Sequence, residues 1–223
     1  MEKGVIDYVI MAVLFDLDGV LVSTDEYHYR SWKKLADEEG FDFFDHEFND
    51  KFRGVARMEC VEILLRRAGR KYSLVQKQEI ADRKNNYFID SLSTVTQEAL
   101  LPGALTTLQK LRERGIKIAV ASNSRNAKTI IRQVGIEHFL NAIVDGYGIE
   151  NSKPDPEIFL LAAKNLNVSP AHCLVVEDAV TGIEAAQRAG MKALGIGPAE
   201  RLPNASIVVP DLAAISVDTL LNL

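Results

Sequence analysis

Cysteine is scarce in this chain, which has 223 residues but only two cysteines, Cys60 and Cys173. The two lie far apart, each among apolar neighbours, so we expect small buried side chains and no disulfide framework. Disulfides persist in oxidising compartments, and their expected absence favours a reduced, cytoplasmic location.

Long apolar runs and basic runs are also missing. No hydrophobic stretch approaches the roughly 20 residues that a membrane-spanning helix needs, so we expect no membrane partner. The formal net charge is −5 without any Lys/Arg-rich run, which gives no support to a nucleic-acid partner. Internal repeats and low-complexity tracts are absent too. A monomer that binds a small molecule is the expectation that remains.

Hydrophobic residues make up 47% of the chain, enough for a sizeable core. Short apolar runs typical of buried strands recur along it, at 12–15, 116–121, 142–144, 173–176 and 193–196. Amphipathic segments of helical length separate the later runs, at 104–114, 127–134, 156–166 and 183–189. This alternation predicts an α/β fold, with a parallel sheet and helices on both faces.

Residues 25–97 interrupt the alternation, because they are rich in charge and contain no buried strand run. Helices are predicted there at 27–39, 57–67 and 75–92. Leu101-Pro102-Gly103 then marks the return to alternation. We therefore expect a helical cap at 25–97, inserted into a core made of 1–24 and 98–223.

Polar residues that can carry chemistry stand at the ends of the predicted strands. In a parallel sheet, ligands bind beyond the carboxyl ends of the strands, so these side chains should converge on one rim. The residues just past strand ends are Asp16, Asp18, Ser122, Glu177 and Asp178. Lys153 lies in the loop after the weaker strand at 142–144, just before a predicted helix.

Asp16 and Asp18 alternate in an extended segment, so both point toward the same face. One carboxylate can attack phosphorus while the other handles the proton of the incoming or leaving oxygen. An ordinary Asp-Gly turn is the plain alternative. A calcium-binding EF-hand loop is disfavoured, because its regular acids and closing Glu are absent.

The remaining candidate residues each have a functional and a purely structural interpretation. Glu177 and Asp178 are adjacent carboxylates that suit Mg²⁺, which takes one or two carboxylates plus phosphate and water, or they form a solvated helix start. Ser122 can donate to a phosphoryl oxygen or cap a helix. Lys153 can neutralise phosphoryl charge or be an ordinary surface lysine. The four elements in this order are far more specific than any one of them.

Together these motifs resemble the haloacid dehalogenase-like superfamily: Phe15-Asp16-Leu17-Asp18-Gly19-Val20, Ala121-Ser122-Asn123, Ser152-Lys153-Pro154 and Val176-Glu177-Asp178. The resemblance spans nearly the whole chain. It implies a Rossmann-like core, Mg²⁺ as cofactor, Asp16 as nucleophile and Asp18 as general acid/base. It also implies Ser122 and Lys153 at the phosphate, and a metal site formed by Asp16, the Asp18 carbonyl, Glu177 and Asp178.

The cap is similar to that of one family within this superfamily, the β-phosphoglucomutases. The segments that carry the similarity are 24–32, 52–57, 83–87 and, in the core, 124–126. The similarity implies a substrate-binding set of His28, Arg53, Gly54, Arg57, Lys84, Arg125 and Asn126. Two residues depart from the pattern of that family. Arg53 stands where a lysine is expected, and this exchange keeps the positive charge but changes the reach of the side chain. Ser23 stands where the family commonly has an acidic residue.

A sugar bisphosphate intermediate would require a second cationic pocket, where Arg57 could clamp the distal phosphate in a bidentate manner, with Arg125 and Asn126 adding contacts. By resemblance, His28 would report substrate binding to Asp18 through Lys84. Taken singly, Arg57 and Lys84 could equally be solvated helix charges, and His28 an ordinary surface histidine.

The expected activity is that of an isomerase interconverting β-glucose 1-phosphate and glucose 6-phosphate through an aspartyl-phosphate and β-glucose 1,6-bisphosphate. The alternative is a Mg²⁺-dependent phosphatase of sugar phosphates or other small phosphomonoesters, with the same core and a cap that admits water. A non-catalytic binding protein is a third class, disfavoured by the intact carboxylates and lysine.

Overall fold

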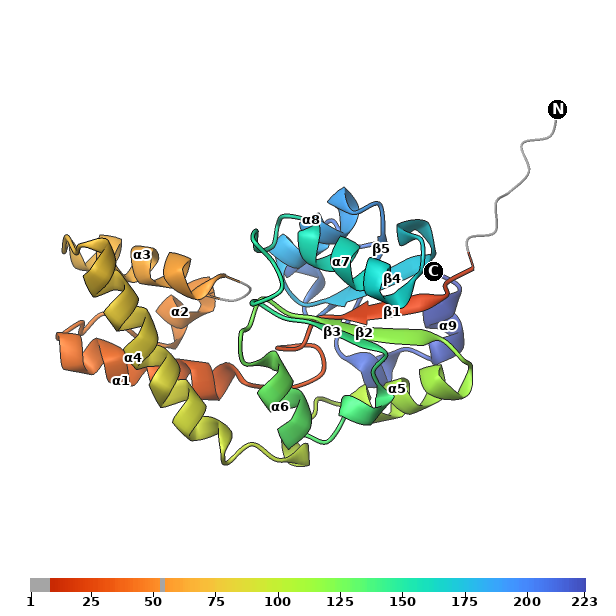
Figure 1. The fold of residues 1–223 in the computed structure, drawn as a ribbon, viewed down its shortest axis with the longest axis horizontal. Helices are drawn as coiled ribbons and strands as arrows, with labels where there is room; N and C mark the ends of the chain where they lie inside the picture. The colour runs from red at the N-terminus through yellow and green to blue at the C-terminus, as the bar shows by residue number, and fades with distance from the viewer. Residues whose placement is uncertain (1–8, 53–54) are drawn as a thin grey trace.

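The computed structural model describes residues 9–52 and 55–223 of the chain. A lobe built on a parallel sheet and a purely helical lobe lie side by side along the long axis (Figure 1). The sheet has six strands in the order β3-β2-β1-β4-β5-β6, all parallel. Their bounds are β1 Ala12–Phe15, β2 Lys117–Ala121, β3 Ala142–Val144, β4 Cys173–Glu177, β5 Lys192–Ile196 and β6 Ile207–Val209.

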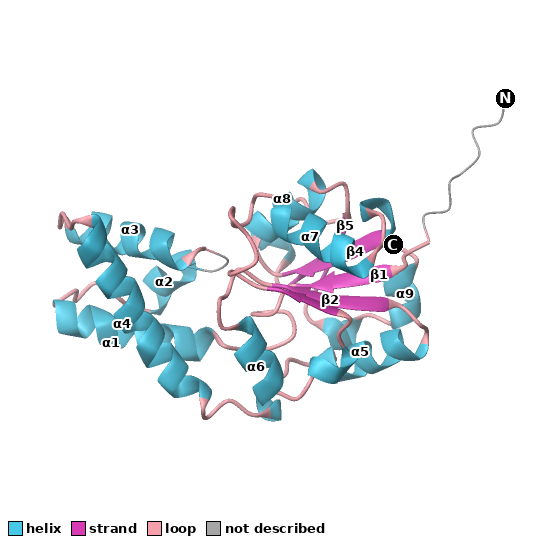
Figure 2. Ribbon diagram, viewed as in Figure 1, coloured by secondary structure: helices cyan, strands magenta, loops and turns pink. Residues whose placement is uncertain are grey.

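Helices cover both faces of the sheet (Figure 2). The side chains of β1 alternate between the two cores that these helices form with the sheet. Val13 and Phe15 point into one core with α5 (Ala104–Glu113), α6 (Ala127–Gln133) and α9 (Val217–Leu221). Ala12 and Leu14 point into the other core with α7 (Glu157–Leu166) and α8 (Val180–Arg188). A central strand buried on both faces must be apolar at every position, and all four residues of β1 are fully buried.

The helical lobe has a core of its own. It contains α1 (Asp25–Glu39), α2 (His46–Asn49), α3 (Arg57–Ala68) and α4 (Leu74–Leu92). Its buried apolar side chains, among them Trp32, Phe44 and Leu64, form a cluster separate from the two that flank the sheet. The helical lobe is thus a packing unit separate from the sheet, while the exact domain limits at 24/25 and 97/98 stay a prediction.

The predicted fold class is confirmed: a parallel sheet with helices on both faces and a helical insert after the first strand. Every predicted strand is present, and Glu177 ends β4 instead of following it. The edge strand β6 and the short helices α2 and α9 escaped prediction. β6 has three residues, none of them buried, so it lacks the apolar run that marks the central strands.

Two further observations concern the expected cysteines and the expected lack of membrane-spanning helices. Cys60 and Cys173 are both buried and unpaired, as predicted. Within the described ranges, none of the helices combines the length and apolar character needed to traverse a lipid bilayer.

Candidate active site

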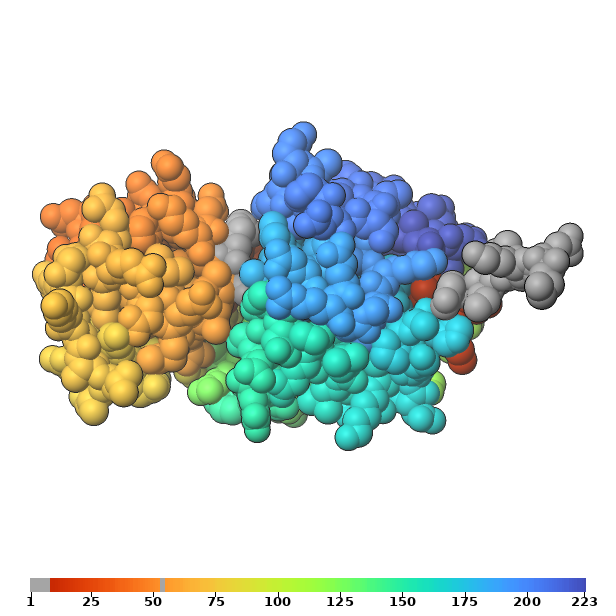
Figure 3. All heavy atoms as spheres, turned by 90° about the horizontal axis from the view of Figure 1, so that it is seen from above, coloured from red at the N-terminus to blue at the C-terminus, as the bar shows by residue number. Residues whose placement is uncertain are grey.

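The order of the strands places the candidate site. Chain order reverses between β1 and β4, which are neighbours in the sheet, and a crevice opens at the carboxyl ends of strands at such a point. The backbone N–H of Asp16 donates to the Val176 carbonyl at 2.9 Å, so the acids after β1 lie beside those that end β4. A cavity of about 390 Å³ lies above this edge, lined by residues of both lobes. Figure 3 shows the lobes as two masses with a waist between them.

Lys153 is the centre of the charged network. Its Nζ donates to Asp16 Oδ1 at 2.5 Å, to Glu177 Oε1 at 2.7 Å and to the Ala121 carbonyl at 3.0 Å. Its side chain is 2% exposed, so the surface-lysine alternative is wrong. The three contacts use the three donors of an ammonium group and fix it against the Asp16 carboxylate.

Asp16 is buried among charges of its own sign. Burial is the largest cause that raises the pKa of Asp16, and the carboxylates of Glu177, Asp178 and Asp18 add to it. Lys153 opposes the rise. Carboxylate oxygens gathered around one lysine are the donors that a divalent cation prefers, so the donor set fits such an ion.

The cation would need ligands beyond these side chains. Across the described part of the chain, no group of three or more His, Cys, Asp or Glu side chains is arranged to hold a metal ion by itself. Mg²⁺ takes only one or two carboxylates and completes its shell with backbone, phosphate and water oxygens.

Glu177 has both carboxylate oxygens engaged with the protein. Oε1 accepts from Lys153, and Oε2 accepts from the Ala179 N–H at 2.8 Å, just before α8 begins. The side chain is 2% exposed. In this structure Glu177 therefore positions the lysine and the start of α8, and its predicted place at the metal stays a prediction.

Asp178 packs against the turn that follows β1. A Cβ atom at Gly19 would lie 2.3 Å from Asp178 Oδ2, and Gly19 has φ +82°, so only glycine fits there. This close approach brings the Asp178 carboxylate to the Asp16–Gly19 loop. Arg201 Nη2 also lies 3.9 Å from Asp178 Oδ2.

Asp18 has the character of an acid/base group. Burial raises the pKa of Asp18 to about 6. The hydrogen bond that the Thr24 hydroxyl donates to Oδ1 acts in the opposite direction and lowers this pKa. Thr24 is fully buried at the junction of the first loop and α1. A carboxyl group whose pKa lies near neutrality can both take and return a proton.

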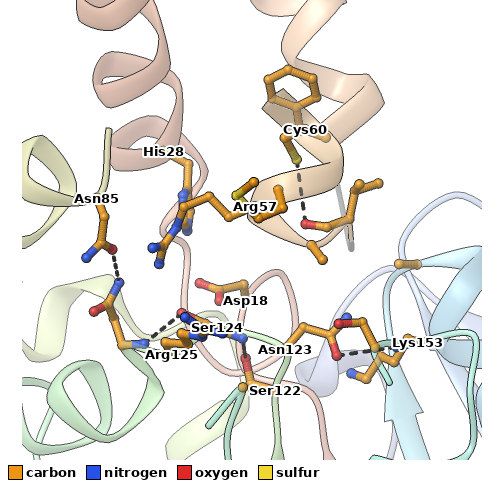
Figure 4. Close-up of a pocket in the computed structure, with 18 of the residues that line it drawn as sticks. Asp18, His28, Arg57, Cys60, Asn85, Ser122, Asn123, Ser124, Arg125 and Lys153 are labelled. Carbon is orange, nitrogen blue, oxygen red and sulfur yellow. Dashed lines mark hydrogen bonds between the residues drawn. The ribbon is translucent and has the colours of Figure 1, made fainter. Parts of the chain in front are cut away.

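Ser122 and Asn123 belong to a tight loop after β2. Ser122 Oγ accepts from the Ser124 N–H at 3.1 Å, which leaves its O–H to donate to an anion. Asn123 Oδ1 accepts from the Lys153 N–H at 3.4 Å. The loop therefore ties the predicted serine to the segment that carries the lysine (Figure 4).

His28 and Lys84 form a pair in the helical lobe. Lys84 Nζ lies 2.6 Å from His28 Nδ1, and the histidine ring stacks on Phe88 with centroids 4.0 Å apart. Burial first, then the charges of Lys84 and Arg57, hold the pKa of His28 well below its usual value. Burial and Arg57 lower the pKa of Lys84 to about 7. With 3% exposure, Lys84 is not a solvated helix charge.

Arg57 and Arg125 line the same cavity from opposite lobes (Figure 4). The pKa of Arg57 is lowered, chiefly by burial and next by the charge of Arg125. Two guanidinium groups that repel each other across a cavity are stabilised by an anion between them. Nearby, Asn126 Nδ2 donates to Asn85 Oδ1 at 2.9 Å, a direct hydrogen bond between the lobes.

The cavity thus contains most of the predicted site residues. Those that line it are Asp16, Asp18, His28, Arg57, Lys84, Ser122, Arg125, Asn126, Lys153, Glu177 and Asp178. Arg53 and Gly54 lie outside the described residues. Sequence reasoning did not assign roles to Thr24 and Asn85. Asn85 lies 41 positions from its hydrogen-bond partner Asn126 in the sequence, and no sequence-spacing rule predicts a contact at that separation.

Comparison with known proteins adds independent findings. Residues 10–190 match the model of the haloacid dehalogenase-like hydrolase family. The chain is 42% identical to β-phosphoglucomutase of Bacillus subtilis, over 94% of this chain and 93% of the relative. It is 32% identical to the phosphorylated carbohydrates phosphatase of Thermotoga maritima, over 81% and 82% of the two chains. The crystal structure of β-phosphoglucomutase from Clostridium difficile matches with a TM-score of 0.89 and 38% identity, over 95% of each chain.

Proposed function

The chain belongs to the haloacid dehalogenase-like hydrolase family, and from this premise we propose that it is a phosphomutase interconverting β-glucose 1-phosphate and glucose 6-phosphate. One observation carries the choice of a mutase: a single cavity holds both the Asp16–Lys153 centre and a second cationic pair, Arg57 with Arg125. A sugar bisphosphate needs two such anion sites. The similarity to β-phosphoglucomutase of Bacillus subtilis supports the same substrate class.

Asp16 is the proposed nucleophile. Lys153 holds its carboxylate from the side of Oδ1, and the ammonium group offsets the negative charge that the phosphoryl group brings. Ser122 donates its hydroxyl to a phosphoryl oxygen. The phosphorus–oxygen bond to the donor breaks as the bond to Asp16 forms, and the leaving oxygen takes a proton from Asp18.

Asp18 then works in the reverse direction. It takes the proton of the sugar C6 hydroxyl while the phosphoryl group passes from Asp16 to that oxygen. The bisphosphate turns round, so that its C1 phosphate meets Asp16 and its C6 phosphate lies between Arg57 and Arg125. Transfer of the C1 phosphate to Asp16, with a proton from Asp18, releases glucose 6-phosphate.

A divalent metal is implied by the family, and we propose Mg²⁺, held by the carboxylates of Asp16 and Asp178 with the Asp18 carbonyl. When bound, the ion would neutralise charge on the transferring phosphoryl group. Glu177 remains a proposed contributor, through its hold on Lys153 or as a ligand. We also propose that the enzyme acts as a monomer.

Water exclusion separates a mutase from a phosphatase. Closure of the helical lobe over the cavity would keep water from the aspartyl-phosphate. The phosphatase of sugar phosphates remains the second candidate, because the same carboxylates and lysine serve both reactions and the relative from Thermotoga maritima is a phosphorylated carbohydrates phosphatase.

Labelling with a small phosphoryl donor tests the nucleophile. With Mg²⁺ and radiolabelled acetyl phosphate, the unsubstituted protein should form an acid-stable aspartyl-phosphate, and Asp16→Asn should form none. Asp18→Asn is the matched carboxylate control, since it retains the nucleophile. Label retained by Asp16→Asn would refute the assignment of Asp16.

A further inference from the structure

Tyr147 lies in the loop between β3 and α7, outside the motifs that led to the site. Its side chain is 74% exposed, so it serves no core. The Arg125 guanidinium carbon lies 5.2 Å from the centre of the Tyr147 ring, which is cation–π geometry. Arg125 is one of the two guanidiniums at the proposed second phosphate position, so its partner bears on substrate recognition.

The loop around Tyr147 is held rigidly. Asp145 Oδ1 accepts from the Tyr147 N–H at 3.1 Å, and the Asp145 carbonyl accepts from the Gly148 N–H at 2.9 Å. The other Asp145 oxygen, Oδ2, lies 3.0 Å from Lys128 Nζ, and the Asp145 side chain is only 4% exposed. The backbone that carries the tyrosine ring is therefore fixed by a buried carboxylate.

The same loop is tied to the segment that carries Arg125. The Gly146 N–H donates to the Ser124 carbonyl at 3.3 Å. A Cβ atom at Gly146 would lie 2.3 Å from the Asn123 carbonyl oxygen and 3.1 Å from Arg125 Cγ. The aliphatic stem of Arg125 therefore passes directly over Gly146, and its guanidinium continues onto the ring of Tyr147.

We propose that Tyr147 is a positioning residue that holds the Arg125 guanidinium opposite Arg57 to receive the non-reacting phosphate of a sugar bisphosphate. This inference rests on the proposed function. A free arginine side chain would have to be ordered at each binding event, and a guanidinium already stacked on a ring has lost much of that freedom beforehand.

Binding measurements without turnover test the proposal. In an Asp16→Asn background, the Kd of β-glucose 1,6-bisphosphate would be measured by calorimetry. The variants compared are the parent with Tyr147, Tyr147→Ala and Tyr147→Phe, each with Arg125 intact and with Arg125→Ala. Tyr147→Ala should weaken binding about two- to fivefold, the factor that an exposed cation–π pair contributes. Tyr147→Phe keeps the ring and should bind like the parent. With Arg125→Ala, the change at Tyr147 should have no further effect.

Equal weakening in both Arg125 backgrounds, or no weakening in either, would overturn the proposal. Failure of the parent to bind β-glucose 1,6-bisphosphate would overturn it as well. Failure of the proposed phosphotransfer would be seen in a different experiment. The protein with Asp16 unsubstituted would then take up no label from acetyl phosphate. The two hypotheses are thus decided by separate measurements.

Discussion

At the scale of single residues, the site depends on buried charges that compensate one another. Lys153 connects two acids from two strands, Asp16 after β1 and Glu177 at the end of β4. Each of the three would be costly to bury alone, because water is not available to solvate it. The geometry that prepares the nucleophile is therefore also a condition for the fold around it.

Replacement of Lys153 by methionine tests this dependence. Lys153→Met leaves Asp16 and Glu177 buried without their cation and should lower the free energy of unfolding by about 3–5 kcal/mol. Urea denaturation would measure it. Lys33→Met is the matched control, since Lys33 and its partner Asp37 are 38% and 58% exposed and such a surface pair should contribute little to stability. Equal losses in the two variants would contradict the account.

Lys84 gives a pH-dependent prediction. Its pKa is about 7 in the folded protein and 10.5 for an ordinary lysine, so between these values the unfolded chain binds more protons. The free energy of unfolding should therefore rise with pH across that window, by about 1.4 kcal/mol per unit at most. Below pH 7 the cost of burying the charged lysine is fully present.

The variant Lys84→Met lacks this titration. It should be more stable than the parent below pH 7 by about 1–4 kcal/mol, with the difference shrinking as pH rises to 10. Its turnover of sugar phosphates should fall, because Lys84 lines the cavity beside His28. Denaturation curves at a series of pH values measure the difference, and a constant offset between the two proteins would contradict the assignment.

At the scale of secondary-structure elements, much of the architecture was predictable. The strands of the centre are short apolar runs followed by polar residues, a pattern that burial on both faces requires. β6 was not predictable because it is an edge strand with no buried residue. The α2 helix has four residues and begins at an Asp45 cap, too short for a periodic pattern.

Site residues that directly follow strand ends could be predicted from the sequence. Contacts that depend on how two elements pack against each other could not. Asp16, Ser122 and Glu177 stand at three neighbouring strands, so sheet topology alone brings them together. The hydrogen bond between Asn85 and Asn126, by contrast, depends on how α4 lies against the start of α6. The engagement of both Glu177 oxygens depends equally on tertiary packing.

The approach of α8 to β4 yields a prediction at this scale. A Cβ atom at Gly182 would lie 1.9 Å from Glu177 Oε1, so Gly182→Ala must displace the carboxylate that holds Lys153. We expect a loss of about 1–3 kcal/mol in the free energy of unfolding and slower labelling of Asp16. Gly148→Ala is the control, because its nearest contact would be an ordinary 3.5 Å. Unchanged labelling in Gly182→Ala would show that this packing does not position the site.

At the scale of the whole molecule, the cavity lies between two lobes with separate cores, and each lobe supplies part of the chemistry. The sheet lobe provides the proposed nucleophile Asp16 and its lysine, while the helical lobe lines the cavity with Arg57, Lys84 and His28. In the proposed mechanism, the residues that act on the phosphoryl group at Asp16 all belong to the sheet lobe. The proposed second phosphate position takes Arg57 from one lobe and Arg125 from the other, so we expect mutations to separate sugar recognition from phosphoryl transfer.

Arg57→Ala tests this division of labour. It should lower kcat/KM for β-glucose 1-phosphate by about 10- to 100-fold, the range expected for losing a charge-assisted hydrogen bond to phosphate. Labelling of Asp16 by acetyl phosphate, which lacks a sugar, should fall much less. Arg66→Ala, an exposed arginine of the same helix, is the matched control. Equal losses with both substrates would mean that Arg57 is structural.

The most direct test of the central claim is a coupled assay with Mg²⁺, β-glucose 1-phosphate and a trace of a phosphoryl primer. Glucose 6-phosphate and free phosphate would be followed together, with α-glucose 1-phosphate as the control substrate. The account predicts rapid formation of glucose 6-phosphate from the β anomer alone, with little phosphate released. Release of phosphate without glucose 6-phosphate would contradict it and identify the chain as a phosphatase.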